Sequence, residues 1–116
     1  MELAHRTLPR VDILTPTGRM QAPEADAFKA KLDELFTAER PRLILDLSGL
    51  DFMSSAGLRV LIEAQRQAQK IRAPGGGHGE IVIADPTANI RDILARTGFT
   101  SFFRVYDDLV EALGNV

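Results

Sequence analysis

RLILDLSGLDFMSSAGLRVL, residues 42–61, is the stretch in which an apolar strand pattern gives way to two serines and then to a helical pattern. Residues 43–47 form a nearly unbroken apolar run, typical of a strand that is covered on both faces at the centre of a sheet. Beyond Ser54 and Ser55, apolar residues recur at helical spacing. Two hydroxyls therefore lie where a strand ends and a helix begins. The unpaired N–H groups and the dipole of a helix N-terminus favour an anion such as a phosphate there.

Strand-like and helix-like patterns alternate on both sides of this stretch. The sequence predicts strands at residues 3–8, 11–15, 43–47, 81–84 and 102–106. It predicts helices that begin near residue 23, after the serine pair, near residue 87 and at residue 107. This alternation indicates an α/β layer fold. With 116 residues and 45% hydrophobic composition, the chain is long enough for one core and too short for two, so we expect a single domain over residues 1–116.

Charge, cysteine content and hydropathy exclude several classes of protein. A net charge of −2 leaves no excess of positive charge to attract a nucleic-acid backbone, so we expect no direct nucleic-acid partner. The chain has no cysteine, which excludes disulfides and thiolate metal sites. Residues 1–14 lack the apolar core of a signal peptide, and no apolar run approaches the ~18 residues of a membrane span. We therefore expect a cytoplasmic protein with no membrane partner.

Side chains that could carry catalytic or metal chemistry are few. His5 and His78 are the only histidines, and neither has a carboxylate at a metal-ligand spacing, so the sequence predicts no metal site. The glycines at 75–79 precede a strand rather than a helix, which favours a hairpin-like linker over a phosphate loop. Ser55 has no identifiable partner histidine and lacks the glycine that precedes the serine of a nucleophile elbow. The sequence thus predicts a protein that is not an enzyme and that binds no cofactor.

From position alone, two roles are open for the serine pair, because Ser54 or Ser55 can either cap the helix or accept a modification. A cap would accept a backbone hydrogen bond worth about 1 kcal/mol. The residues three positions after Ser54 and Ser55 are Gly57 and Leu58 rather than Glu or Gln, so no capping box supports that role. Capping is also predicted for the aspartates near element ends, Asp51, Asp85, Asp107 and Asp108.

Residues 43–61, LILDLSGLDFMSSAGLRVL, resemble the signature of the STAS family of anti-sigma factor antagonists. In that family a hydrophobic strand ends in Asp-Leu-Ser and leads, past an aromatic residue, into an Asp-Ser-Ser/Thr-Gly-Leu turn. PTGRMQ at 16–21 resembles the family's Gly-Glu-Leu-Asp element, and residues 81–113 resemble its closing strand–helix–strand–helix. The resemblance implies a single STAS-like α/β domain, with a four- to five-stranded mixed sheet and helices packed mainly on one face.

The same resemblance implies a function and its partners. In the family, the unphosphorylated antagonist binds an anti-sigma factor that is also a serine kinase, which frees the sigma factor and so regulates transcription indirectly. Phosphorylation of the first serine of the turn ends this binding, and a phosphatase restores it. The resemblance therefore implies a phosphoprotein that acts in signal transduction by partner switching.

Matched residue by residue, the phosphoacceptor serine is Ser55. The resemblance further implies a set of residues around it that bind the partner, namely Gln21, Met53, Ser54, Gly57 and Leu58. The chain departs from the family pattern at two of these positions, since Ser54 and Gln21 stand where the family has acidic residues. Ala56 replaces the second hydroxyl residue of the turn, which leaves Ser54 as the alternative phosphoacceptor.

Two other functions are open. A STAS-like interaction subunit that is never phosphorylated would keep the fold and dock on a transporter ATPase or in a signalling scaffold, and the two missing acids favour it. An enzyme would use Ser55 as a nucleophile, but the sequence offers no identifiable general base for it.

Overall fold

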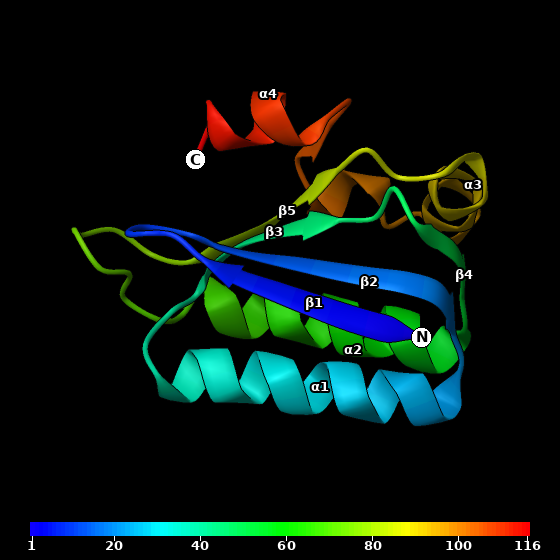
Figure 1. Cartoon of the computed structure of the whole chain (residues 1–116), viewed down its shortest axis with the longest axis horizontal. Helices are drawn as coiled ribbons and strands as arrows, with labels where there is room; N and C mark the ends of the chain where they lie inside the picture. Colours follow the sequence, from blue (N-terminus) through cyan, green and yellow to red (C-terminus); the bar gives the residue numbers. More distant parts are fainter.

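The computed structural model describes residues 1–116 and contains a mixed sheet with helices on both faces and at one end (Figure 1). Its strands are β1 (Glu2–Thr7), β2 (Asp12–Met20), β3 (Arg42–Asp46), β4 (Leu50–Met53), β5 (Glu80–Ala84) and β6 (Val105–Tyr106). Its helices are α1 (Ala22–Thr37), α2 (Ser55–Ala68), α3 (Ala88–Thr97), the 3-10 turn η1 (Thr100–Phe102) and α4 (Leu109–Leu113). The predicted α/β domain is confirmed.

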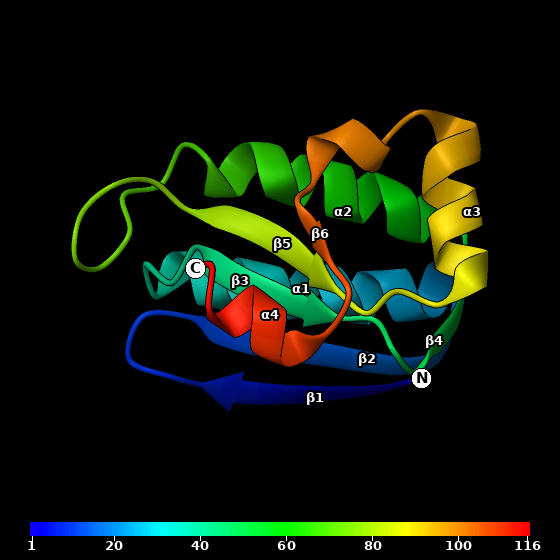
Figure 2. The same ribbon diagram turned by 90° about the horizontal axis from the view of Figure 1, so that it is seen from above.

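The sheet has the order β1-β2-β3-β5-β6, and β4 is joined to it through β2 (Figure 2). β1 pairs with β2 antiparallel, and every other pair is parallel. β2 therefore has two parallel neighbours on one side, because its first residues pair with β3 and its last residues pair with β4. This divergence brings the carboxyl end of β2 to the carboxyl end of β4.

The sixth strand, β4, is the main difference from the predicted four- to five-stranded sheet. The carboxylate of Asp46 accepts hydrogen bonds from the backbone N–H of Ser48 at 3.1 Å and from its hydroxyl at 2.7 Å, which stabilises a turn after β3. The turn leads into β4, which pairs only with β2. β4 has only four residues, and its sequence pattern was too short to predict a strand. Asp51 lies exposed within β4, and its predicted capping role was wrong.

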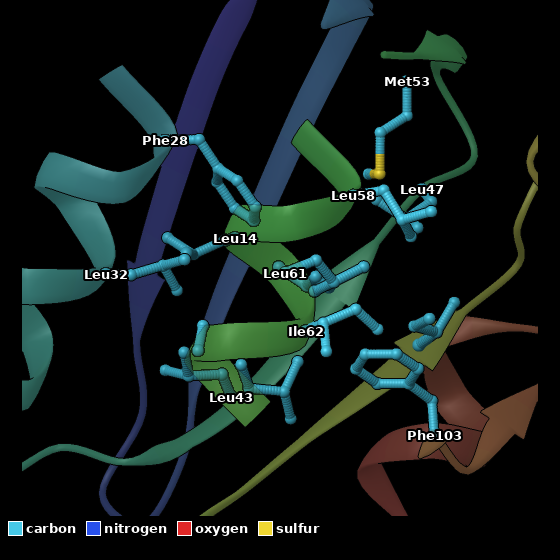
Figure 3. Packing of buried hydrophobic residues seen from close by; sticks show 14 of the residues in the cluster. Leu14, Phe28, Leu32, Leu43, Leu47, Met53, Leu58, Leu61, Ile62 and Phe103 are labelled. Carbon is cyan, nitrogen blue, oxygen red and sulfur yellow. The ribbon is translucent and has the colours of Figure 1, made fainter. Parts of the chain in front are cut away.

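Most of the hydrophobic core lies between the sheet and helices α1 and α2. On β3, Leu43 and Leu45 point into this layer while Ile44 points to the opposite face, as strand alternation requires. The layer holds 22 buried residues, against 6 in the layer under α4, so the prediction of helices mainly on one face is confirmed. Figure 3 shows the larger layer, with side chains of α1 and α2 packed against those of the strands.

The C-terminal third departs from the predicted boundaries. The predicted strand 102–106 is reduced to the two residues of β6, because residues 100–102 form a 3-10 turn. Asp108 caps α4 as predicted, since its carboxylate accepts from the backbone N–H of Glu111 at 2.7 Å. Thr87 caps α3, so the capping role predicted for Asp85 was wrong. Asp107 forms an ion pair with Arg91 at 3.5 Å instead of a cap.

The glycine-rich segment before β5 forms a hairpin-like linker, as predicted. Arg72 and His78 form an isolated antiparallel bridge across it, and three consecutive glycines, Gly75 to Gly77, adopt positive φ angles. No helix of the chain has both the length and the apolar character that a membrane crossing requires.

Candidate functional site

Two strand-to-helix junctions lie side by side at one end of the sheet. Met20 and Met53 are register partners at the carboxyl ends of β2 and β4. The backbone N–H of Ser54 donates to the carbonyl oxygen of Met20 at 2.8 Å, which ties the second junction to the first. Helices α1 and α2 both begin here, so two helix N-termini with their unpaired N–H groups share this end of the molecule.

Ser54 is the N-cap of α2. Its backbone is extended, with φ −73° and ψ 169°, and its hydroxyl accepts a hydrogen bond from the N–H of Gly57 at 3.2 Å. Its carbonyl oxygen accepts the first helical bond, from Leu58 at 2.9 Å. Of the two roles open for the serine pair, Ser54 therefore performs the structural one.

Ser55 is the first residue of α2, and its side chain is exposed. None of the hydrogen bonds of the structure involves its hydroxyl, in contrast to the hydroxyl of Ser54. The two adjacent serines thus differ in chemistry, because one hydroxyl is committed to the helix and the other is open to an approaching reagent. No histidine lines the hollow beside Ser55, and its one carboxylate, Glu63, is paired with Arg66 at 3.5 Å.

Gln21 occupies the equivalent position at the other junction, as the exposed N-cap of α1. Its backbone N–H donates to the Glu24 carboxylate at 3.0 Å, which is half of a capping box. Sequence reasoning missed this pair, although the Q-x-x-E spacing of residues 21–24 was readable. Ser54 and Gln21, the two positions where acids were expected, therefore both serve as helix caps.

Three of the five residues named with Ser55 lie beneath the surface. Met53 is 3% exposed and Leu58 is 7% exposed, and both belong to the main core. Gly57 is buried against the methionines, since a Cβ there would lie 2.8 Å from the sulfur of Met20 and 3.0 Å from Cγ of Met53. A larger residue where α2 crosses the ends of β2 and β4 would therefore have to displace these methionine side chains. A role of these three residues in partner binding stays a prediction.

An open hollow of about 320 Å³ lies beside Ser55, along α2 and up to the segment after α3. Its lining is Ser55, Leu58, Arg59, Ile62, Glu63, Arg66 and Phe99. Arg59 lies four residues after Ser55 and forms no ion pair, whereas Glu63 pairs with Arg66 at 3.5 Å. Phe99 follows α3 and lies far from Ser55 in the sequence, so no local sequence pattern could have predicted that it lines this hollow.

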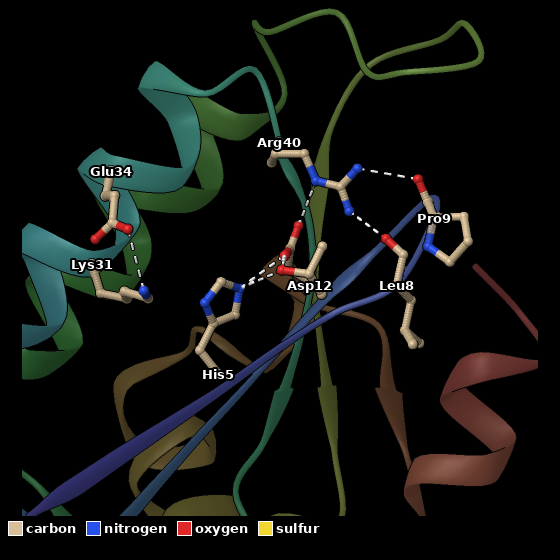
Figure 4. Close-up of polar contacts among 8 residues, drawn as sticks. His5, Leu8, Pro9, Asp12, Lys31, Glu34 and Arg40 are labelled. Atoms are coloured by element: carbon tan, nitrogen blue, oxygen red, sulfur yellow. Dashed lines mark hydrogen bonds and ion pairs between the residues drawn. The ribbon is translucent and has the colours of Figure 1, made fainter.

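A second polar cluster lies at the opposite end of β2 (Figure 4). Asp12, which is 1% exposed, accepts hydrogen bonds from Thr7 at 2.7 Å and from Arg40 at 2.8 Å, and its carboxylate lies 2.8 Å from Nε2 of His5. Burial raises the pKa of Asp12, but the hydrogen bonds from His5, Thr7 and Arg40 and the charge of Arg40 outweigh it and hold the pKa below its ordinary value. His5 thus has a structural partner, and this cluster is separate from the serine site.

Comparisons with known proteins agree on one family. A family model described as the STAS domain matches residues 2–112. BtrV of Bordetella bronchiseptica, a provisionally named anti-sigma factor antagonist, is 31% identical over 88 residues, which cover 76% of this chain and 71% of BtrV.

Solved structures show the same fold. The crystal structure of tm1081 from Thermotoga maritima, also a provisionally named anti-sigma factor antagonist, matches with a TM-score of 0.86 and 22% identity over 98% of this chain and 93% of that one. The anti-sigma factor antagonist SpoIIAA in its unphosphorylated form matches with a TM-score of 0.81 and 16% identity over 98% and 95% of the two chains. Bacillus SpoIIAA in its phosphorylated form matches with a TM-score of 0.74 and 15% identity over 98% of each chain.

Proposed function

Because this chain belongs to the STAS domain family, we propose that it is an anti-sigma factor antagonist whose partner is a kinase-type anti-sigma factor. In this proposal the unphosphorylated chain binds the anti-sigma factor and frees a sigma factor. Phosphorylation of Ser55 ends the binding, and a phosphatase restores it. The whole of residues 1–116 acts as one STAS domain.

The observation that carries this proposal is the difference between the two serines. The hydroxyl of Ser54 is held by the N–H of Gly57, whereas the hydroxyl of Ser55 is exposed and makes no hydrogen bond. A kinase can therefore reach Ser55 without first opening the helix. Modification of Ser54 would instead remove the N-cap of α2.

A phosphate at Ser55 suits this fold on electrostatic grounds. It adds a charge of about −1.5 to −2 and three acceptor oxygens. The helix dipole favours this charge at the first turn of α2, and Arg59, one turn further along, has no other ion-pair partner. The family's acidic neighbours are replaced by the uncharged Ser54 and Gln21, which removes like-charge repulsion from the phosphorylated state. The fold thus tolerates a group that a closely packed partner surface excludes.

The test is binding of the anti-sigma factor from the same genome to charge variants of the chain. Ser55→Glu is expected to raise the Kd at least about tenfold, because a desolvated or repelled carboxylate at an interface costs more than ~1.4 kcal/mol. Ser55→Ala is expected to bind within about twofold of the parent, since it removes no hydrogen bond.

Thr37→Glu is the matched control. Thr37 is the exposed last residue of α1, at the opposite end of that helix from the site, so a carboxylate there should leave the Kd unchanged. Isothermal titration calorimetry or biolayer interferometry measures all four proteins. Binding of Ser55→Glu as tight as that of the parent would overturn the charge switch.

A further inference from the structure

The outer edge of β1 has no partner within the chain. β1 pairs only with β2, and Figure 2 shows it at the margin of the sheet with no element beyond it. An edge strand of six residues presents a row of free backbone N–H and C=O groups, which is a template for a further strand. Proteins usually protect such an edge against pairing with charged side chains, a proline or a bulge, so the arrangement of the charges on β1 decides whether a second strand can add.

The hairpin geometry defines which backbone groups point outward. The N–H of Leu8 donates to the carbonyl oxygen of Val11 at 2.9 Å, so these two residues form a hydrogen-bonded pair. Hydrogen-bonded and non-hydrogen-bonded pairs alternate along an antiparallel ladder. Leu3 accordingly faces Pro16 in a non-hydrogen-bonded pair, which fits the missing N–H of proline. The residues whose backbone groups point to the open edge are Leu3, His5 and Thr7.

The side chains of β1 match those of a second β1 strand when the two run antiparallel and cross at Ala4. In an antiparallel pair of two β1 strands centred on Ala4, Leu3 of one copy lies opposite His5 of the other, so the outward backbone groups of both meet in hydrogen-bonded pairs. Glu2 of one copy then lies opposite Arg6 of the other, twice by symmetry. These two residues are in non-hydrogen-bonded positions, where opposite side chains are closest.

We propose that the β1 edge binds a second copy of this chain in this register, which makes one continuous sheet across a twofold axis. Glu2 and Arg6 are both exposed and form no ion pair within the chain, so each is free for the other copy. The methyl group of Ala4 leaves room for close approach at the axis. Beside it, a hollow of about 210 Å³ on the α4 side of the sheet is lined by Ala4, His5, Arg6, Ile13, Thr15 and Leu109.

The test is charge reversal on the full chain, followed by sedimentation or by light scattering after size exclusion, from about 1 μM to about 1 mM. The parent is expected to dimerise with rising concentration. Glu2→Arg and Arg6→Glu each place like charges opposite one another twice, and each should weaken the dimer about tenfold or more. The double variant Glu2→Arg/Arg6→Glu restores opposite charges and should restore the dimer.

Arg72→Glu, an exposed change in the linker before β5, is the control that should leave the dimer unchanged. Hydrogen exchange adds a backbone measurement, because the amides of Leu3 and His5 should exchange slowly in the dimer and fast in the single-reversal variants. A parent that stays monomeric to the highest concentration would overturn the proposal. So would a double variant no better associated than the single ones, which would assign the contact to another surface or another protein.

Discussion

The carboxylate of Asp12 joins three segments that are far apart in the sequence. It bonds to His5 and Thr7 on β1, and to Arg40 in the connection between α1 and β3. Arg40 in turn donates to the carbonyl oxygens of Leu8 and Pro9 in the β1–β2 turn. A single buried charge therefore ties the edge hairpin to the helical layer.

We predict that Asp12→Asn lowers the free energy of unfolding at pH 7 by about 2–4 kcal/mol, because it removes the buried carboxylate with which the partly buried Arg40 is paired. The lowered pKa of Asp12 means that the folded state favours its charged form. This contribution is present above the unfolded-state pKa and is lost as the pH falls through the folded-state value. Urea unfolding of the parent and of Asp12→Asn should therefore give a larger difference in the free energy of unfolding at pH 7 than at about pH 3, which is below the ordinary pKa of an aspartate. Parallel pH curves for the two proteins would contradict this account.

At the scale of one element, two adjacent residues at the start of α2 have different roles: Ser54 caps the helix, and Ser55 is the proposed phosphoacceptor. We predict that Ser54→Ala destabilises the protein by about 1 kcal/mol, because the N–H of Gly57 loses its acceptor. Ser55→Ala is the matched control, and it should change stability by less than about 0.5 kcal/mol, since its hydroxyl is exposed and unbonded. Chemical denaturation with an unchanged slope measures both, and an equal loss for the two variants would show that the caps are assigned wrongly.

Elements with a strong local pattern could be predicted from the sequence, and elements defined by pairing could not. The long apolar run of β3 and the helical spacing of α2 placed both correctly, and the serine pair marked their junction. β4 was missed because its existence depends on the carboxyl end of β2, which the local sequence does not describe. The helix cap at Gln21 was missed although its spacing to Glu24 was visible, because glutamine is not among the residues preferred at an N-cap.

At the scale of the whole molecule, the site depends on β2 having two neighbours, because its first residues pair with β3 and its last residues pair with β4. Met20 and Asp12 lie at opposite ends of β2, about 26 Å apart for eight extended steps, so the serine site and the Asp12 cluster are distant from each other. Arg59 and Phe99 reach the hollow beside Ser55 from different parts of the chain. The sequence indicated Ser55, but the surroundings of Ser55 follow from the packing of α2 against the sheet and from the position of α3.

The most direct test of the switch is the identity of the phosphorylated residue. The parent, Ser55→Ala and Ser54→Ala are incubated with the kinase-type anti-sigma factor and Mg-ATP, and intact mass and peptide mapping follow. We predict that the parent and Ser54→Ala each gain a single phosphate on Ser55, and that Ser55→Ala gains none. A phosphate on Ser54, or no phosphate on the parent, would contradict the account.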